Sequence, residues 1–175
     1  MKRRACVLAL LVLSCGAGER RPAVLFDFEE EKDLDRMFWT CGDRFALAGE
    51  WSASGERSLR CELAPEAYPG VRFRDFRTDW SGYDTLSFSL RNDGDEPFEL
   101  VVRIDDPASG EEIGRRYNGA FRVIPGENRI AVPLAEVRAA RSPEPLDLSR
   151  VRLFMLFIRN ARCAPPFLLD RIALS

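Results

Sequence analysis

The chain has 175 residues, with 26 Lys or Arg, 28 Asp or Glu, a formal net charge of −2 and no histidine. A balanced charge argues against a nucleic-acid partner, which needs a strongly basic surface. The missing histidine removes the commonest metal ligand and excludes Ser-His and Cys-His nucleophile pairs. Chemistry that uses carboxylates alone, such as glycoside hydrolysis, stays open.

The N-terminus reads MKRRACVLALLVLSC and is typical of an export signal. Basic residues precede an apolar run from Ala5 to Leu13, which is too short to span a bilayer and ends in small residues. Val12 to Cys15 resembles the lipobox of bacterial lipoproteins, in which the cysteine is lipidated and becomes the mature N-terminus. We predict a signal peptide over 1–15, lipidation at Cys15 and a location in the bacterial cell envelope, with plain secretion as the alternative.

Residues 16–22 are predicted to form a short tether, and 23–175 a single domain. Within this domain, short runs alternate apolar and polar residues and are separated by Gly, Pro, Asn and Asp, which is the signature of β-strands. The predicted strands cover 23–29, 45–51, 57–64, 71–76, 84–92, 97–105, 120–124, 128–134, 151–158 and 167–174. One helix is predicted over 134–140. This pattern indicates an all-β protein, an antiparallel β-sandwich of the jelly-roll type.

The segment DWSGYDTLSFSL at 79–90 concentrates aromatic residues that suggest either a sugar platform or a core. Its alternation places Leu86, Phe88 and Leu90 on one strand face, which we expect to be buried. Trp80 and Tyr83 flank the turn that enters this strand. We expect both to be part of the scaffold rather than of a binding site.

Several motifs follow in one order along 24–175, and together they resemble a known superfamily. These are YPGVRFRDFRTDWSGYDTLSFSLRN, VVRIDD, YNGAF, PGENRIAVPL, LDLSRVRLFMLF and FLLDRIAL. They are similar to the carbohydrate-binding-module-like domains of the galactose-binding jelly-roll superfamily. The resemblance implies a jelly roll that binds a polysaccharide or oligosaccharide without catalysing a reaction.

The resemblance also implies a structural Ca²⁺ near the first and last strands, held by Glu29 and Asp170. Ca²⁺ prefers several carboxylate and carbonyl oxygens. Asp170 lies between Leu168 and Ile172 on what should be the core face, where a carboxylate needs a partner. Glu29 has the opposite parity to Phe28, so the two acids converge only if a bulge intervenes. The alternative is that Asp170 caps backbone amides or pairs with an arginine.

Three cysteines remain after the signal segment. Cys61 shares a strand face with Leu59 and is expected to be a small buried hydrophobe. Cys41 follows the first strand and Cys163 precedes the last. If these strands pair antiparallel, as the resembled fold implies, the two loops meet at one end, and we predict a Cys41–Cys163 disulfide in an oxidising compartment.

Polar residues at the end of the VVRIDD strand form the predicted ligand surface. Alternation places Arg103 and Asp105 on one face, opposite Val102 and Ile104. Guanidinium and carboxylate groups hold sugar hydroxyls, and an aromatic ring stacks on a pyranose. The predicted ligand-binding residues are Arg103, Asp105, Asp106, Tyr117, Asn118 and Trp39. The alternative is a solvated sheet face with internal Arg–Asp pairs.

Three functions are compatible with these patterns. The first is a non-catalytic carbohydrate-binding lipoprotein of the envelope. The second is a protein-interaction or assembly domain of the envelope on the same fold, which would bind a protein partner instead of sugar. The third, a glycoside hydrolase, would need paired carboxylates such as Asp105 with Glu111 or Glu112.

Overall fold

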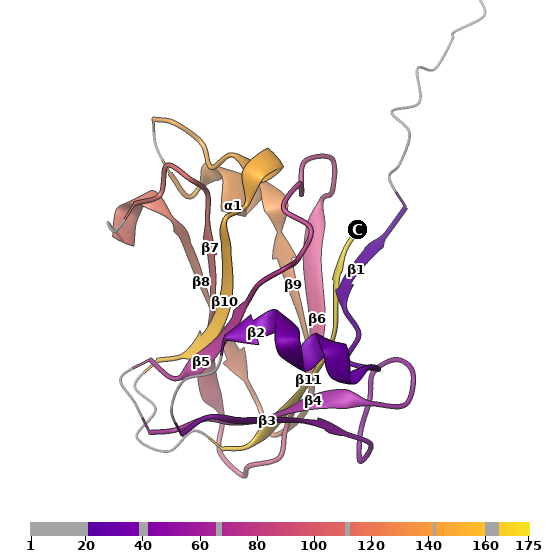
Figure 1. Ribbon diagram of the computed structural model, residues 1–175. Helices are drawn as coiled ribbons and strands as arrows, with labels where there is room; N and C mark the ends of the chain where they lie inside the picture. Colours follow the sequence, from indigo (N-terminus) through magenta and orange to yellow (C-terminus); the bar gives the residue numbers. More distant parts are fainter. Residues whose placement is uncertain (1–20, 39–41, 66–67, 111–112, 142, 160–164) are drawn as a thin grey trace, which may run out of the picture.

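Alternating residues build two sheets that face each other, as Figure 1 shows. The computed structural model describes residues 21–38, 42–65, 68–110, 113–141, 143–159 and 165–175. The first sheet contains β1 (Ala23–Phe26), β3 (Arg44–Ala48), β4 (Ser58–Glu62), β6 (Thr85–Asn92), β9 (Gly126–Pro133) and β11 (Phe167–Leu174). The second contains β2 (Met37–Phe38), β5 (Gly70–Phe73), β7 (Phe98–Asp105), β8 (Tyr117–Val123) and β10 (Leu153–Ile158).

The strand order confirms the predicted fold class, an antiparallel jelly-roll sandwich. The first sheet runs β3-β4-β11-β6-β9, with β1 also paired to β11, and the second runs β2-β5-β10-β7-β8. The predicted helix is α1 (Leu134–Ala139), and short 3₁₀ turns span Glu31–Arg36, Ile113–Arg115 and Leu148–Arg150. In the described part of the chain, no helix has the length and apolar character needed to cross a membrane.

The core lies between the sheets and follows the predicted alternation. Leu86, Phe88 and Leu90 of β6 are all buried in it, as are alternate residues of β7 and β10. Burial of such side chains is the main favourable term in folding, worth about 1.5–3 kcal/mol for each large apolar side chain. The faces of β7 are as predicted, because Val102 and Ile104 point into this core.

Trp80 is part of the scaffold, as its place beside the 84–92 strand predicts. It is fully buried, its indole N–H donates to the Arg77 carbonyl at 2.6 Å, and its ring meets Phe154 edge-on with centroids 5.6 Å apart. Phe154 in turn stacks on Phe73 at 4.8 Å. Tyr83 is buried as well. The aromatic cluster in this segment therefore belongs to the core.

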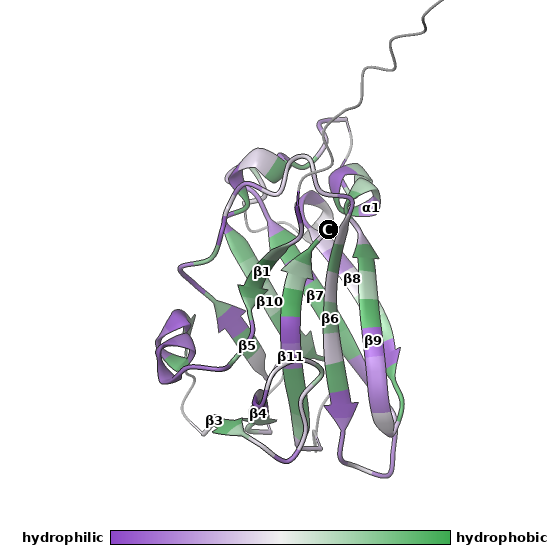
Figure 2. Ribbon diagram, turned by 90° about the vertical axis from the view of Figure 1, so that its right-hand side faces the viewer, coloured by the Kyte–Doolittle hydropathy of each residue, from purple (hydrophilic) through white to green (hydrophobic). Residues whose placement is uncertain are grey.

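Irregularities in β1 and β11 change the predicted side-chain faces. Alternation along 23–29 would place Val24 on one face with the buried Phe26, but Val24 is 45% exposed, because the register of β1 shifts between these two residues. In β11 the register shifts after Asp170, where Arg171 has a φ of 49°. Figure 2 shows this point as a hydrophilic interruption of an apolar strand. The bulge returns Ile172 to the core. Leu169 also belongs to the core, so alternation places the fully buried Asp170 on the opposite face of β11 and not on the core face as predicted.

The strand β2 was not predicted, because two residues are too few for an alternating pattern to be visible. It nevertheless completes the edge of the second sheet by pairing with β5.

Cys61 is fully buried among core residues, as predicted, and burial raises the pKa of its thiol well above the usual value. It is therefore a packing residue and a poor nucleophile. Cys15, Cys41 and Cys163 lie outside the described residues.

The Cys41–Cys163 disulfide stays a prediction, and the strand register supports it. Phe45 of β3 and Phe167 of β11 both pair with Cys61 on the intervening β4, so β3 and β11 run parallel to each other. The first residues of β3 and β11 therefore lie at the same end of the sheet. We expect a non-reduced peptide digest to contain a Cys41–Cys163 cross-linked peptide that disappears on reduction. Recovery of either cysteine as a free, alkylatable thiol would contradict the pairing.

Candidate functional site

The outer face of the second sheet carries a row of side chains that crosses all five strands. Strand register places Phe38 beside Arg72, Arg72 beside Met155, Met155 beside Arg103 and Arg103 beside Asn118. Neighbouring strands lie about 4.8 Å apart, so the row is roughly 19 Å long. Because alternate residues of β7 and β10 fill the core, the side chains of this row are directed away from it.

A hollow of about 430 Å³ lies over this row, which we call the central hollow. This volume is in the range of small-molecule sites. Its lining is Tyr68, Arg103, Arg116, Asn118, Met155, Phe157 and Arg159.

Two rings provide the apolar wall of the central hollow. Tyr68 is 64% exposed and meets the half-buried Phe157 edge-on, with centroids 5.8 Å apart. Phe157 lies opposite Gly70 on β5. A Cβ on Gly70 would lie 2.2 Å from the carbonyl oxygen of Leu156, so only glycine allows this close approach of β5 to β10.

Arg103 is held at the hollow by a two-pronged ion pair. Its Nε donates to Asp105 Oδ1 at 3.0 Å, and a terminal nitrogen donates to Oδ2 at 2.6 Å. Asp105 is fully buried, whereas the Arg103 side chain is partly exposed. A guanidinium has five N–H donors in one plane, so the fork fixes its orientation and leaves donors beside the hollow. Asp105 therefore positions Arg103.

Arg116 and Asn118 bring further polar groups to the same place. Both line the hollow, and they are two residues apart at the start of β8. The Nε of Arg116 is buried and has no hydrogen-bond partner among the described residues. A buried donor without a partner costs free energy, so this end of the hollow is a costly position for a guanidinium.

Other residues predicted to bind ligand lie elsewhere. Tyr117 has the opposite parity to Asn118, so its ring packs in the core and is only 8% exposed. Trp39 lies outside the described residues. Trp51, in the loop after β3, donates its indole N–H to Glu127 Oε1 of β9 at 3.0 Å, away from the central hollow.

Asp106 faces inward because the β7 strand has ended and its backbone turns. It is buried and accepts hydrogen bonds from Arg141 at 2.7 Å, the Asp147 amide at 2.9 Å and the Ser109 hydroxyl at 2.9 Å. Burial by itself would raise the pKa of Asp106, but these hydrogen bonds and the Arg141 charge lower it to about 2. Asp106 ties three loop segments together and does not reach the hollow.

Glu29 and Asp170 converge on one loop, as a bulge allows. Asp170 Oδ2 accepts from the amides of Ala53 and Ser54 at 2.7 and 2.9 Å, and its Oδ1 accepts from the Arg171 amide at 2.6 Å. Glu29 Oε1 accepts from the amides of Glu56 and Arg57 at 3.0 and 3.1 Å. Burial raises the pKa of Asp170, and the backbone hydrogen bonds oppose that rise.

These contacts fit backbone amides and not a Ca²⁺ ion. Each amide N–H points its positively polarised hydrogen at a carboxylate lone pair. A bound cation would need that lone pair for itself. Within the described ranges, no group of three or more His, Cys, Asp or Glu could hold a metal. The capping alternative for Asp170 agrees with this geometry, and the pair has a structural role that needs no ion.

Comparison with solved structures gives the same fold. A family 11 carbohydrate-binding module from Clostridium thermocellum, in complex with a β-1,3-1,4-mixed-linked tetrasaccharide, superposes with a TM-score of 0.60 at 16% identity, over 87% of this chain and 94% of that chain. A xylan-binding domain from Paenibacillus barcinonensis gives a TM-score of 0.54 at 13% identity, over 87% and 94%. The chain has the jelly-roll fold of a carbohydrate-binding module.

This module fold also occurs as one part of larger enzymes. An exo-β-agarase structure matches with a TM-score of 0.70 at 15% identity, over 87% of this chain but 24% of that chain. In sequence, β-agarase B from a Vibrio species is 42% identical over 59 residues, which is 32% of this chain and 6% of the agarase. No protein-family profile matches the chain.

Sequence reasoning missed much of the central hollow. Tyr68 lies outside every predicted strand, next to Pro69-Gly70, and Met155 and Phe157 lie within the predicted apolar strand 151–158. The signal for the last two was their alternation with Phe154, Leu156 and Ile158, which assigns them to the outer face.

The Asp106–Arg141 pair makes the free energy of unfolding depend on pH in the acid range. The folded pKa of Asp106 is below its ordinary value of 3.8, so its contribution is complete above that value and is lost as the pH falls through about 2. We expect this group to contribute about 2 kcal/mol to the free energy of unfolding at neutral pH.

Asp106→Asn should remove the pH-dependent contribution of this group to the free energy of unfolding. It should also lower the stability by about 3 kcal/mol at pH 7, because the buried Arg141 guanidinium loses its counter-charge. Urea unfolding of both proteins at pH 7, 4 and 3 measures the two effects. A variant that loses as much stability on acidification as the unchanged protein would contradict this assignment.

Proposed function

We propose that the protein is a non-catalytic carbohydrate-binding module whose sugar site is the central hollow. The observation that carries the proposal is the meeting of exposed rings and oriented polar donors on one sheet face. Tyr68 and Phe157 offer apolar surface to the C–H face of a sugar ring, while Arg103 and Asn118 offer hydrogen bonds to its hydroxyls. The fold shared with modules bound to or named for glycans supports this function.

Binding without catalysis agrees with the chemistry on this face. Glycoside hydrolysis needs two carboxyls in a cleft, one of them free to protonate the leaving oxygen. Asp105, the acid of the hydrolase alternative, is fully buried and has both oxygens bonded to Arg103. Glu111 and Glu112 lie outside the described residues.

We further propose that Cys15 carries the lipid that anchors this module in a bacterial envelope membrane. The support is the basic and apolar N-terminal sequence that ends at the lipobox-like Val12–Cys15 segment. In bacteria expressing the full chain and fed labelled palmitate, we expect the label in the protein and its loss in Cys15→Ala. Equal labelling of both chains, or none in either, would overturn the anchor.

Removal of the exposed ring should weaken sugar binding without weakening the fold. We expect Tyr68→Ala to raise the Kd for a bound polysaccharide about tenfold to thirtyfold, since a well-placed aromatic contact is worth about 1.5–2 kcal/mol. Its unfolding temperature should stay unchanged, because the side chain is mostly exposed. Affinity electrophoresis in gels containing mixed-linkage glucan, xylan, agarose or acidic polysaccharides measures the binding.

The matched control is Val24→Ala, which truncates an exposed apolar side chain on the first sheet. It should bind like the unchanged protein. If the unchanged protein binds no polymer of the panel, neutral or charged, the sugar-binding proposal fails and the protein-interaction alternative takes its place.

A further inference from the structure

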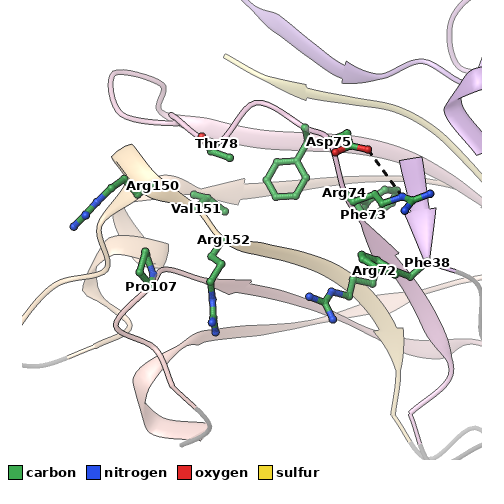
Figure 3. A pocket seen from close by; sticks show the side chains of 11 residues that line it. Phe38, Arg72, Phe73, Arg74, Asp75, Thr78, Pro107, Arg150, Val151 and Arg152 are labelled. Carbon is green, nitrogen blue, oxygen red and sulfur yellow. Dashed lines mark ion pairs between the residues drawn. The ribbon is translucent and has the colours of Figure 1, made fainter. Parts of the chain in front are cut away.

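A second hollow, of about 580 Å³, borders the same sheet face (Figure 3). Its lining includes Phe38 and Arg72, which form one end of the cross-strand row. It also includes Val151 and Arg152, just before β10. Residues 151 to 159 connect the two hollows, because Val151 lines this hollow and Arg159 lines the central hollow. An extended chain of this length spans roughly 26 Å. We call it the arginine hollow.

Four guanidinium groups line the arginine hollow, against one carboxylate. They belong to Arg72, Arg74, Arg150 and Arg152, and the carboxylate is that of Asp75. All four arginines are exposed. This excess of positive charge contrasts with the chain as a whole, whose formal net charge is −2.

Two of these arginines are already engaged. Arg74 donates through Nε to the Asp35 carbonyl at 2.8 Å, and its Nε lies 4.0 Å from Asp75. Arg150 pairs with Asp147 at 2.9 Å. These contacts hold the edges of the hollow in place.

The other two have donors to spare. In the part of the chain that the structure describes, the side chains of Arg72 and Arg152 make no hydrogen bond or ion pair. The Phe38 ring orients Arg72, because its centroid lies 4.7 Å from the guanidinium carbon. Figure 3 shows the side chains of Arg72, from β5, and Arg152, just before β10, extending into the same hollow. Stacking on the ring orients Arg72 without using its N–H donors.

We propose that the arginine hollow binds an anionic group, a carboxylate or a sulfate, carried by the polysaccharide whose sugar rings occupy the central hollow. The inference rests on the proposed function and specifies its ligand class as an acidic glycan. Planar guanidinium forks suit both anions, because each presents paired oxygens. The central hollow adds Arg103, Arg116 and Arg159 to this face; Arg103 pairs with Asp105 and Arg159 with Glu99 at 3.3 Å, so among the described residues the uncompensated positive charge lies at Arg72, Arg116 and Arg152.

A sugar polymer fits this face better than a nucleic acid. The acidic excess of the remaining chain repels a duplex, whose dense charge needs a broad basic surface. The exposed rings and oriented donors of the central hollow suit a sugar chain. The arginine hollow beside them is large enough for one charged substituent of that chain, whereas a duplex would present many phosphates at once.

The test uses polymers that differ only in charge. Polygalacturonate is compared with its methyl ester, and a sulfated galactan with the same galactan after desulfation, by affinity electrophoresis and calorimetry with the purified protein. A DNA duplex is the third polyanion. Arg72→Gln and Arg152→Gln, singly and together, are compared with Arg129→Gln, which removes the same charge from an exposed position on the first sheet.

We expect at least one charged polymer to bind about tenfold more tightly than its neutral counterpart at low salt, with the difference shrinking as salt is added. The pair that shows the difference identifies carboxylate or sulfate. The double variant should lose this preference and keep its affinity for the neutral polymer, whereas Arg129→Gln should keep both. Tyr68→Ala should weaken both members of a pair by the same factor.

The possible failures are distinct. Equal affinity for charged and neutral polymers, or a preference that survives in the double variant, overturns the anionic site and leaves the carbohydrate-binding module intact. Equal affinity for the DNA duplex and the acidic glycans overturns the glycan assignment. Absence of binding to every polysaccharide overturns both this inference and the proposed function.

Discussion

The packing of Phe154 against Phe73 and Trp80 in the core fixes the geometry on which the outer face depends. Phe154 is central in the second sheet, and its ring stacks on the neighbouring strand while Trp80 closes over it. A slip of one residue in β10 would expose this ring and bury Met155 and Phe157 instead, so the core holds the register firmly. The same register sets the order of side chains in the cross-strand row.

Acidic and basic residues are used differently in this chain. Among the residues that the structure describes, five aspartates are buried but only one arginine is. The aspartates form ion pairs or accept backbone amide hydrogen bonds within the scaffold; they are Asp33, Asp43, Asp105, Asp106 and Asp170. Arginines remain at the surface, and seven of them line the two hollows of the outer face. A net charge near zero therefore conceals a local excess of guanidinium groups on the outer face of the second sheet.

The sequence was sufficient for the sandwich, the faces of β6 and β7 and the orientation of Arg103, because alternation depends only on neighbouring residues. It was insufficient where the chain leaves that pattern. Asp106 follows the last strand residue and meets Arg141 from a distant loop, a contact that no local pattern reveals. The bulge at Arg171 uses a positive φ at a residue other than glycine, so the outward direction of Asp170 had no local signal.

The two hollows give one sheet face more guanidinium groups than carboxylates, so the surface charge of the molecule is uneven. One sheet face carries the two cationic hollows, and the rest of the chain carries an excess of acid residues, since the total is −2. Near an anionic polymer, such a particle is turned by the field before it makes contact. The protein then meets the proposed acidic glycan with its cationic face toward it. The association rate should therefore depend on ionic strength, even where the stability of the complex comes mainly from stacking of aromatic rings on sugar rings.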